Sequence, residues 1–153
     1  MNKGCCFTGH RSIDKNDEMM IVQELEKAVE TEIVGGVLDF YNGAAYGFDL
    51  MAAQVVLQMK NKYENIKLHL IIPNEKQSAK WDEEQIRIYD FVKNNADSVE
   101  ILSEHYFRGC MQIRNRMLVD KSDICICYIR KDSGGTAFTL NYAKKKGLKI
   151  IYL

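Results

Sequence analysis

Short apolar segments alternate with helical patterns along the whole chain, and this alternation constrains the fold more than any other feature. Several of the strand-like segments are apolar at nearly every position, as in CCF, LHLII and ICICYI, which is typical of strands covered on both faces. The stretches between them repeat apolar residues at the spacing of a helix. The pattern predicts strands at residues 4–8, 37–41, 66–72, 98–102, 123–128 and 149–153, and helices at residues 17–34, 48–62, 79–95, 111–121 and 136–146.

Strands that alternate with helices in this way favour a parallel sheet between two helical layers. We therefore predict an α/β fold, a Rossmann-like three-layer α/β/α sandwich with a mostly parallel sheet of about six strands. A chain of 153 residues suits one domain over residues 1–153. Its 21 basic and 21 acidic residues exclude an overall basic surface. No signal-peptide pattern and no apolar run near the ~20 residues of a membrane span is visible, so we expect a cytoplasmic protein.

The cysteines and one histidine are interpreted as packing residues. The chain has five cysteines, none in C-x-x-C spacing, and free cysteine is among the most buried residue types. We assign them no chemistry and expect no metal site. His69 alternates with apolar residues in the expected strand 66–72 and is predicted to be a packed core histidine.

Three glycine-containing loops follow expected strands, at residues 8–11, 42–49 and 132–136. In a parallel sheet such loops meet at the carboxyl ends of the strands, where ligands bind. Glycine lets backbone N–H groups approach a ligand, and the start of the following helix favours an anion. One such loop is an ordinary turn, but three at one edge favour a ligand site.

Arg11 and Arg114, with Arg116 beside the latter, are expected at the same edge. The guanidinium group offers a planar set of donors that suits phosphate. The chain contains neither G-x-G-x-x-G nor G-x-x-x-x-G-K-[ST], so no dinucleotide or P-loop fingerprint is present and we expect no cofactor.

The order of these motifs resembles the YpsA-like branch of the SLOG superfamily, which is related to Smf/DprA and LOG domains. The resemblance rests on CFTGHR at residues 6–11, on N-G-A-x-x-G-x-D-x-x-A-A at residues 42–53, and on R-N-x-x-L-V-D-x-S-D with G-G-T at residues 114–136. It implies a pocket for a nucleotide or a nucleotide derivative at the strand ends.

Our leading hypothesis is a nucleotide-binding domain, a sensor or signalling module with weak or no catalysis. Trp81 is the candidate for base stacking, with Tyr46 and Tyr106 as weaker candidates. A homodimer is the default assembly for a soluble oligomer. The candidate ligand-binding residues are Thr8, Gly9, His10, Arg11, Asn42, Gly43, Ala44, Gly47, Asp49, Arg114, Asn115, Ser133, Gly134, Gly135 and Thr136.

Two alternatives come from the related domains. A LOG-like nucleoside 5'-monophosphate phosphoribohydrolase would use Arg114, but Phe138 and Thr139 replace the carboxylates of the LOG loop. Asp49 or Asp120 would then have to supply a carboxylate from elsewhere in the fold. DprA-like binding of single-stranded DNA would need a basic groove, for which residues 144–146 (KKK) give thin support because cations also suit a helix end.

Overall fold

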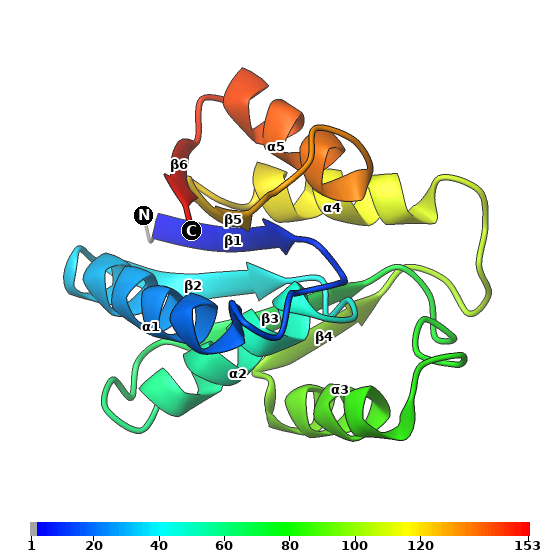
Figure 1. The fold of residues 1–153 in the computed structure, drawn as a ribbon, viewed down its shortest axis with the longest axis horizontal. Coiled ribbons are helices and arrows are strands. Elements are labelled where there is room, and N and C mark those ends of the chain that lie inside the picture. Colours follow the sequence, from blue (N-terminus) through cyan, green and yellow to red (C-terminus); the bar gives the residue numbers. More distant parts are fainter. Residues whose placement is uncertain (1–2) are drawn as a thin grey trace.

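The computed structural model describes residues 3–153 and contains one six-stranded, all-parallel sheet with the strand order β4-β3-β2-β1-β5-β6 (Figure 1). This architecture confirms the predicted α/β sandwich. The strands are β1 (Lys3–Gly9), β2 (Val37–Asn42), β3 (Lys67–Ile72), β4 (Ser98–Ile101), β5 (Ile124–Tyr128) and β6 (Lys149–Tyr152). The helices are α1 (Glu18–Val34), α2 (Phe48–Met59), α3 (Glu83–Asn95), α4 (Cys110–Asp120) and α5 (Gly135–Lys145).

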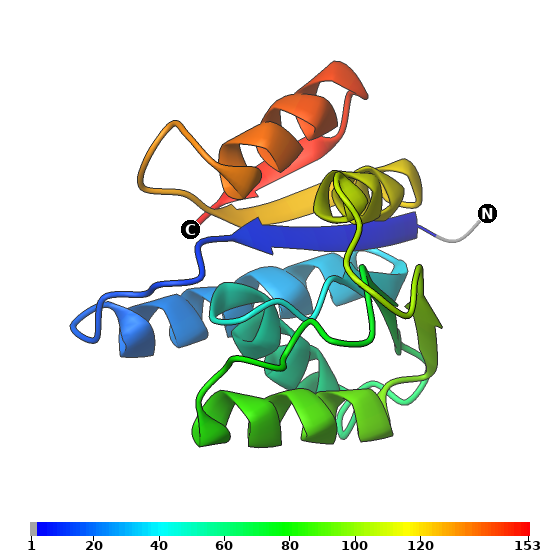
Figure 2. The same cartoon turned by 90° about the vertical axis from the view of Figure 1, so that its right-hand side faces the viewer.

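The helices form two layers. α1, α2 and α3 cover one face of the sheet, and α4 and α5 cover the other (Figures 1 and 2). The chain moves from β1 outward to β4 and then returns to place β5 on the other side of β1. The strand order therefore reverses between β1 and β5, and the carboxyl ends of these two strands form the topological switch point at which such folds bind ligands.

The core explains why the strands are apolar throughout. On the α1–α3 face, Cys5, Phe7 and Phe40 belong to a large buried cluster, while Cys6 and Cys125 belong to a smaller cluster under α4 and α5. Cys6 and Cys125 are register partners on β1 and β5. All five cysteines are buried and none forms a disulfide, in agreement with their prediction as packing residues.

His69 is not a packed core residue, and that prediction was wrong. Its Nε2 lies 2.8 Å from Oδ1 of Asp39 and its Nδ1 lies 2.7 Å from Oγ of Ser98, while its ring stacks on Tyr41. The side chains of His69 and Asp39 are each 20% exposed. The register pairs Tyr41 with His69 and His69 with Ser98, so three strands place these polar groups side by side. The ring therefore bridges strands on a partly open area of the α4–α5 face.

Helix α3 begins four residues later than predicted. Oδ1 of Asp82 accepts a 2.9 Å hydrogen bond from the N–H of Gln85, which makes Asp82 the N-cap. Residues 75–80 form turns instead of a first helical turn. The cap, and not the apolar spacing that starts at Trp81, sets the boundary.

Candidate functional site

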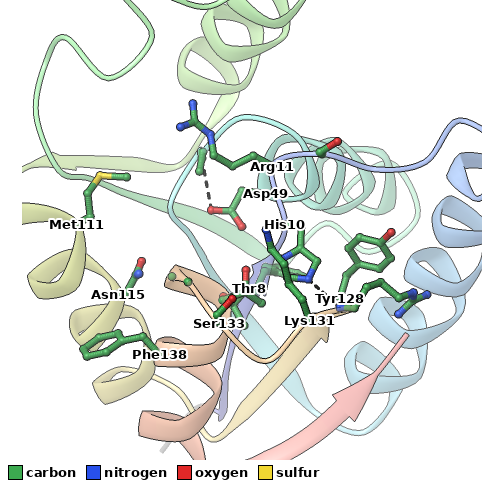
Figure 3. Close-up of a pocket in the computed structure, with 18 of the residues that line it drawn as sticks. Thr8, His10, Arg11, Asp49, Met111, Asn115, Tyr128, Lys131, Ser133 and Phe138 are labelled. Carbon is green, nitrogen blue, oxygen red and sulfur yellow. Dashed lines mark hydrogen bonds between the residues drawn. The ribbon is translucent and has the colours of Figure 1, made fainter.

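A cavity of about 930 Å³ opens at the carboxyl ends of β1 and β5 (Figure 3). The loops after β1 and β5, the first turns of α4 and α5, and Asp49 of α2 line it. The sequence-predicted residues among its lining are Thr8, Gly9, His10, Arg11, Asp49, Arg114, Asn115, Ser133, Gly134, Gly135 and Thr136. Two of the three glycine loops thus meet at the cavity directly, and the third contributes Asp49.

His10 joins the loop after β1 to the loop after β5. Its Nε2 accepts a 2.7 Å hydrogen bond from the backbone N–H of Arg130, and its ring meets the edge of Tyr128. Burial lowers the pKa of His10, and the nearby charges of Lys131 and Arg130 lower it further. His10 is therefore neutral at pH 7, as its role as an acceptor requires.

Three exposed cations surround this side of the cavity: Arg11, Arg130 and Lys131. Arg130 lies over the ring of Tyr128, 4.4 Å from its centroid, and its Nη1 donates a 2.9 Å hydrogen bond to the carbonyl oxygen of Leu153. Sequence reasoning missed Arg130 and Lys131. Their position directly between the end of a strand and a glycine loop is the signal that would have found them.

The first turn of α5 borders the same cavity. Gly134, with φ +90°, precedes the helix in a conformation that favours glycine, and no side chain caps the first turn. Thr136 is 7% exposed, and Ser133 lies on the exposed loop beside it. The helix start therefore offers backbone N–H groups and two hydroxyls next to the exposed cations, an arrangement suited to an anion.

The loop after β2 forms the wall behind Asp49. Nδ2 of Asn42 donates a 2.8 Å hydrogen bond to the carbonyl oxygen of Asp49, and its Oδ1 accepts one of 2.7 Å from the N–H of Ala44. Gly47 packs so closely against the carbonyl group of Arg11 that a Cβ at this position would overlap the oxygen. Four predicted ligand-binding residues do not line the cavity and instead shape this loop: Asn42, Gly43, Ala44 and Gly47.

Arg114 is fixed at the cavity wall and is only 3% exposed. Its Nη1 donates hydrogen bonds of 2.7 Å to the carbonyl oxygen of Gly43 and 3.2 Å to Oε1 of Gln77, and its Nε donates one of 2.8 Å to Oδ1 of Asn115. Nη2 makes no hydrogen bond to another residue within residues 3–153. Sequence reasoning missed Gln77, because nothing in its neighbourhood marks it.

Asp49 is a buried carboxyl group on the same wall. Burial raises its pKa to about 6, opposed by the charge of Arg114 and by backbone hydrogen bonds from Ala45 and Gly43. Burial also lowers the pKa of the Arg114 guanidinium, which Asp49 partly restores. Asp49 therefore changes protonation near neutral pH at the surface of the cavity.

The aromatic side chains at the cavity differ from those we expected. Trp81 packs edge-on against Tyr46 and Tyr89 and does not line the cavity, and neither do Tyr46 and Tyr106. Phe138, in the first turn of α5, is a lining residue instead, as is Met111 on α4. α4 and α5 therefore add two large apolar side chains to a lining that also includes Phe7, Ala45 and Tyr128.

The fold and the site define a Rossmann-like α/β domain with a partly cationic cavity at its topological switch point. The chain belongs to the YpsA family, described as the YspA SLOG family, whose model matches residues 5–152. This confirms the resemblance seen in the motifs. Among curated relatives, a UPF0398 protein of Bacillus cereus is 28% identical over 142 residues, covering 91% of this chain and 73% of the relative. A UPF0398 protein of Halalkalibacterium halodurans is 30% identical over 137 residues, covering 88% and 68%.

Two solved structures share the fold. DNA processing protein A (DprA) from Streptococcus pneumoniae matches with a TM-score of 0.69 and 18% identity, over 99% of this chain and 50% of the DprA chain. DprA from Helicobacter pylori, studied for its single-stranded DNA binding, matches with a TM-score of 0.67 and 17% identity, over 98% of this chain and 64% of the other. The chain thus spans half to two thirds of these DprA chains.

The described part of the chain has neither a membrane-spanning helix nor a metal-binding cluster of side chains. No helix there is both long and apolar enough to cross a bilayer. Residues 3–153 also contain no cluster of three or more histidine, cysteine, aspartate or glutamate side chains that could hold a metal ion.

Proposed function

We propose that this domain binds a nucleotide or a nucleotide-derived ligand in the cavity at the carboxyl ends of β1 and β5, as a sensor or signalling module. One observation carries the proposal. Three exposed cations, the uncapped start of α5 and the buried Arg114 border a single cavity at the point where the strand order reverses. A phosphate group needs this combination of charge and backbone donors.

Each part of the site has a role in this proposal. The phosphate lies at the start of α5, where the hydroxyl groups of Ser133 and Thr136 donate hydrogen bonds to it and Arg130 and Lys131 supply positive charge. Asp49 accepts a hydrogen bond from a ribose hydroxyl group, as carboxylates commonly do in such folds. Asn42 and Gly43, which do not line the cavity, hold Asp49 and Arg114 in position through their hydrogen bonds.

Binding of single-stranded DNA is the second candidate, favoured by the fold shared with two DprA structures. The surface next to the cavity argues against a long polyanion. A second cavity of about 720 Å³ shares Arg11 and contains Lys15, but its rim also carries Glu18, Asp82 and Glu84. These carboxylates would repel a phosphate backbone that continued over this face. The first cavity also carries carboxylates, Asp14, Asp17 and Asp49, but a small ligand at the start of α5, beside Arg130 and Lys131, does not have to cross the acidic rim of the second cavity.

Nucleotide hydrolysis is the third candidate, and the position of Asp49 favours it. Asp49 and Arg114 line the same cavity, whereas Oδ1 of Asp120 accepts a hydrogen bond from Tyr142 and the residue does not line the cavity. A buried carboxyl group near an oxocarbenium-like state could stabilise cleavage of an N-glycosidic bond. Release of free base from nucleoside monophosphates, lost in Arg114→Ala, would establish this activity.

Isothermal titration calorimetry and thermal shift with nucleoside monophosphates, ADP-ribose, NAD, cyclic nucleotides and an oligonucleotide test the proposal. We expect at least one small nucleotide to bind. The double variant R130Q/K131Q should lose about 10-fold or more in affinity, as removal of two charge-assisted hydrogen bonds implies. The matched control K144Q/K145Q removes the same charge from exposed lysines outside the cavity lining and should bind normally. Equal loss in both double variants, or binding of the oligonucleotide alone, would contradict the proposal.

A further inference from the structure

Two large apolar side chains, Met111 and Phe138, line the cavity on the side of α4 and α5. Met111 and Phe138 lie together with Asn115 on one side, while His10, Tyr128 and Lys131 lie on the other (Figure 3). Phe138 is 37% exposed and lines the cavity, so its ring is accessible to a ligand.

The ring of Phe138 is contacted by a neighbouring cation on α4. The guanidinium carbon of Arg116, which does not line the cavity, lies 5.9 Å from the ring centroid. Such a contact helps to hold an exposed ring in place. Met111 and Asn115 are four residues apart on α4 and so share one face of that helix. Met111, Asn115 and Phe138 thus form a small wall of two apolar side chains and one of the two amide groups that line the cavity, the other being Gln112.

The amide of Asn115 has its orientation set by Arg114. Because Oδ1 accepts the 2.8 Å hydrogen bond from Nε of Arg114, the amide nitrogen is the group left for a ligand. Nδ2 makes no hydrogen bond within residues 3–153. The position therefore presents a donor and selects for an acceptor, such as a carbonyl oxygen or an unprotonated ring nitrogen.

We infer that this wall, formed by Met111, Asn115 and Phe138, is a base-recognition subsite: the nucleobase stacks on Phe138 and Met111 and accepts a hydrogen bond from Nδ2 of Asn115. The inference rests on the proposed function and adds the orientation of the ligand, with its phosphate toward the start of α5 and its base toward α4. It also predicts which class of ligand binds more tightly. A nucleotide contacts the site through both its phosphate and its base, whereas a sugar phosphate contacts it only through its phosphate.

Titration calorimetry with the four nucleoside 5'-monophosphates and with ribose 5-phosphate tests the subsite. We expect the wild-type protein to bind at least one nucleotide about 10-fold or more tightly than ribose 5-phosphate, since stacking of one base contributes this much. Phe138→Leu should reduce this ratio about 5-fold or more and leave the affinity for ribose 5-phosphate unchanged. Phe107→Leu is the matched control, because Phe107 is 39% exposed and outside the cavity lining.

Asn115→Asp keeps the acceptor for Arg114 and removes the donor. Its added charge acts on the phosphate of both ligands, so the ratio of the two affinities isolates the base. That ratio should fall about 5-fold or more for the preferred nucleotide. An unchanged ratio in both variants, or equal wild-type affinity for ribose 5-phosphate and every nucleotide, overturns the subsite and leaves phosphate binding intact. Absence of binding by all five ligands overturns the proposed function as well.

Discussion

Nη1 of Arg114 donates a 2.7 Å hydrogen bond to the carbonyl oxygen of Gly43, so that α4 and the loop after β2 are joined behind the cavity. Gln77 joins the same cluster, since its Nε2 lies 3.1 Å from the carbonyl oxygen of Ala44. The guanidinium is therefore both part of the cavity wall and a structural link between three segments that are distant in sequence.

Substitution of Gly43 by alanine should be destabilising because there is no room for a side chain. A Cβ at this position would lie 2.7 Å from Nη1 of Arg114 and 2.9 Å from Oδ2 of Asp49. We expect Gly43→Ala to lower the free energy of unfolding by about 1–3 kcal/mol, as overpacking of a buried site does. Urea denaturation measures this change.

Gly135→Ala is the matched control for Gly43→Ala. A Cβ at Gly135 has no atom within 4 Å, and alanine is favourable at the start of a helix. Its free energy of unfolding should match or slightly exceed that of the wild type. Equal destabilisation by both substitutions would show that Gly43 is not closely enclosed by Arg114 and Asp49.

The pKa of Asp49 makes stability depend on pH. With a pKa of about 6 in the folded protein, raised from 3.8 mainly by burial, the folded state holds a proton that the unfolded chain has released. The free energy of unfolding should therefore fall by about 3 kcal/mol, through this group, as pH rises from about 4 to about 6. Above that pH the contribution of Asp49 should stay constant. Asp49→Asn should remove this component of the difference between urea denaturation curves at pH 4.5 and pH 7. A variant that keeps the full difference would exclude Asp49 as its source.

The sequence predicted the sheet, its helices and the edge that carries the cavity because these follow from local patterns. Continuous apolar strands indicate burial on both faces, and the loops after parallel strands must meet at one edge. What could not be predicted depends on contacts between distant residues. Gln77 joins the site only through Arg114, and Trp81 is drawn away from it by Tyr46 and Tyr89.

His69 illustrates the same limit. Its apolar neighbours in β3 suggested a buried position, but its ring is partly exposed and lies among polar side chains of the neighbouring strands. The register then places Asp39 and Ser98 on either side of the ring.

The hydrogen bonds of His69 should stabilise the outer strands. His69→Ala removes both bonds and the stacking on Tyr41, and should lower the free energy of unfolding by about 1–3 kcal/mol. Ser98→Ala removes one bond and should cost about 1 kcal/mol. In the double variant the two effects should not add, because Ser98 has already lost its partner. Additive losses in urea denaturation would show that the two side chains do not interact.

The titration of Asp49 should also control ligand affinity. Above a pKa of about 6 its carboxylate adds negative charge to the cavity wall, so an anionic ligand should bind more weakly as pH rises from 5 to 7. ADP-ribose is the suitable probe, because its pyrophosphate does not change charge in this range, unlike a phosphate monoester with a second pKa near 6.

His10 contributes in the same direction only where it becomes protonated, and its lowered pKa places that at more acidic pH. Asp49→Asn should therefore flatten the affinity profile between pH 6 and pH 7, while His10→Gln should leave that part of the profile in place. A profile that Asp49→Asn does not change would separate the carboxyl group from the binding site.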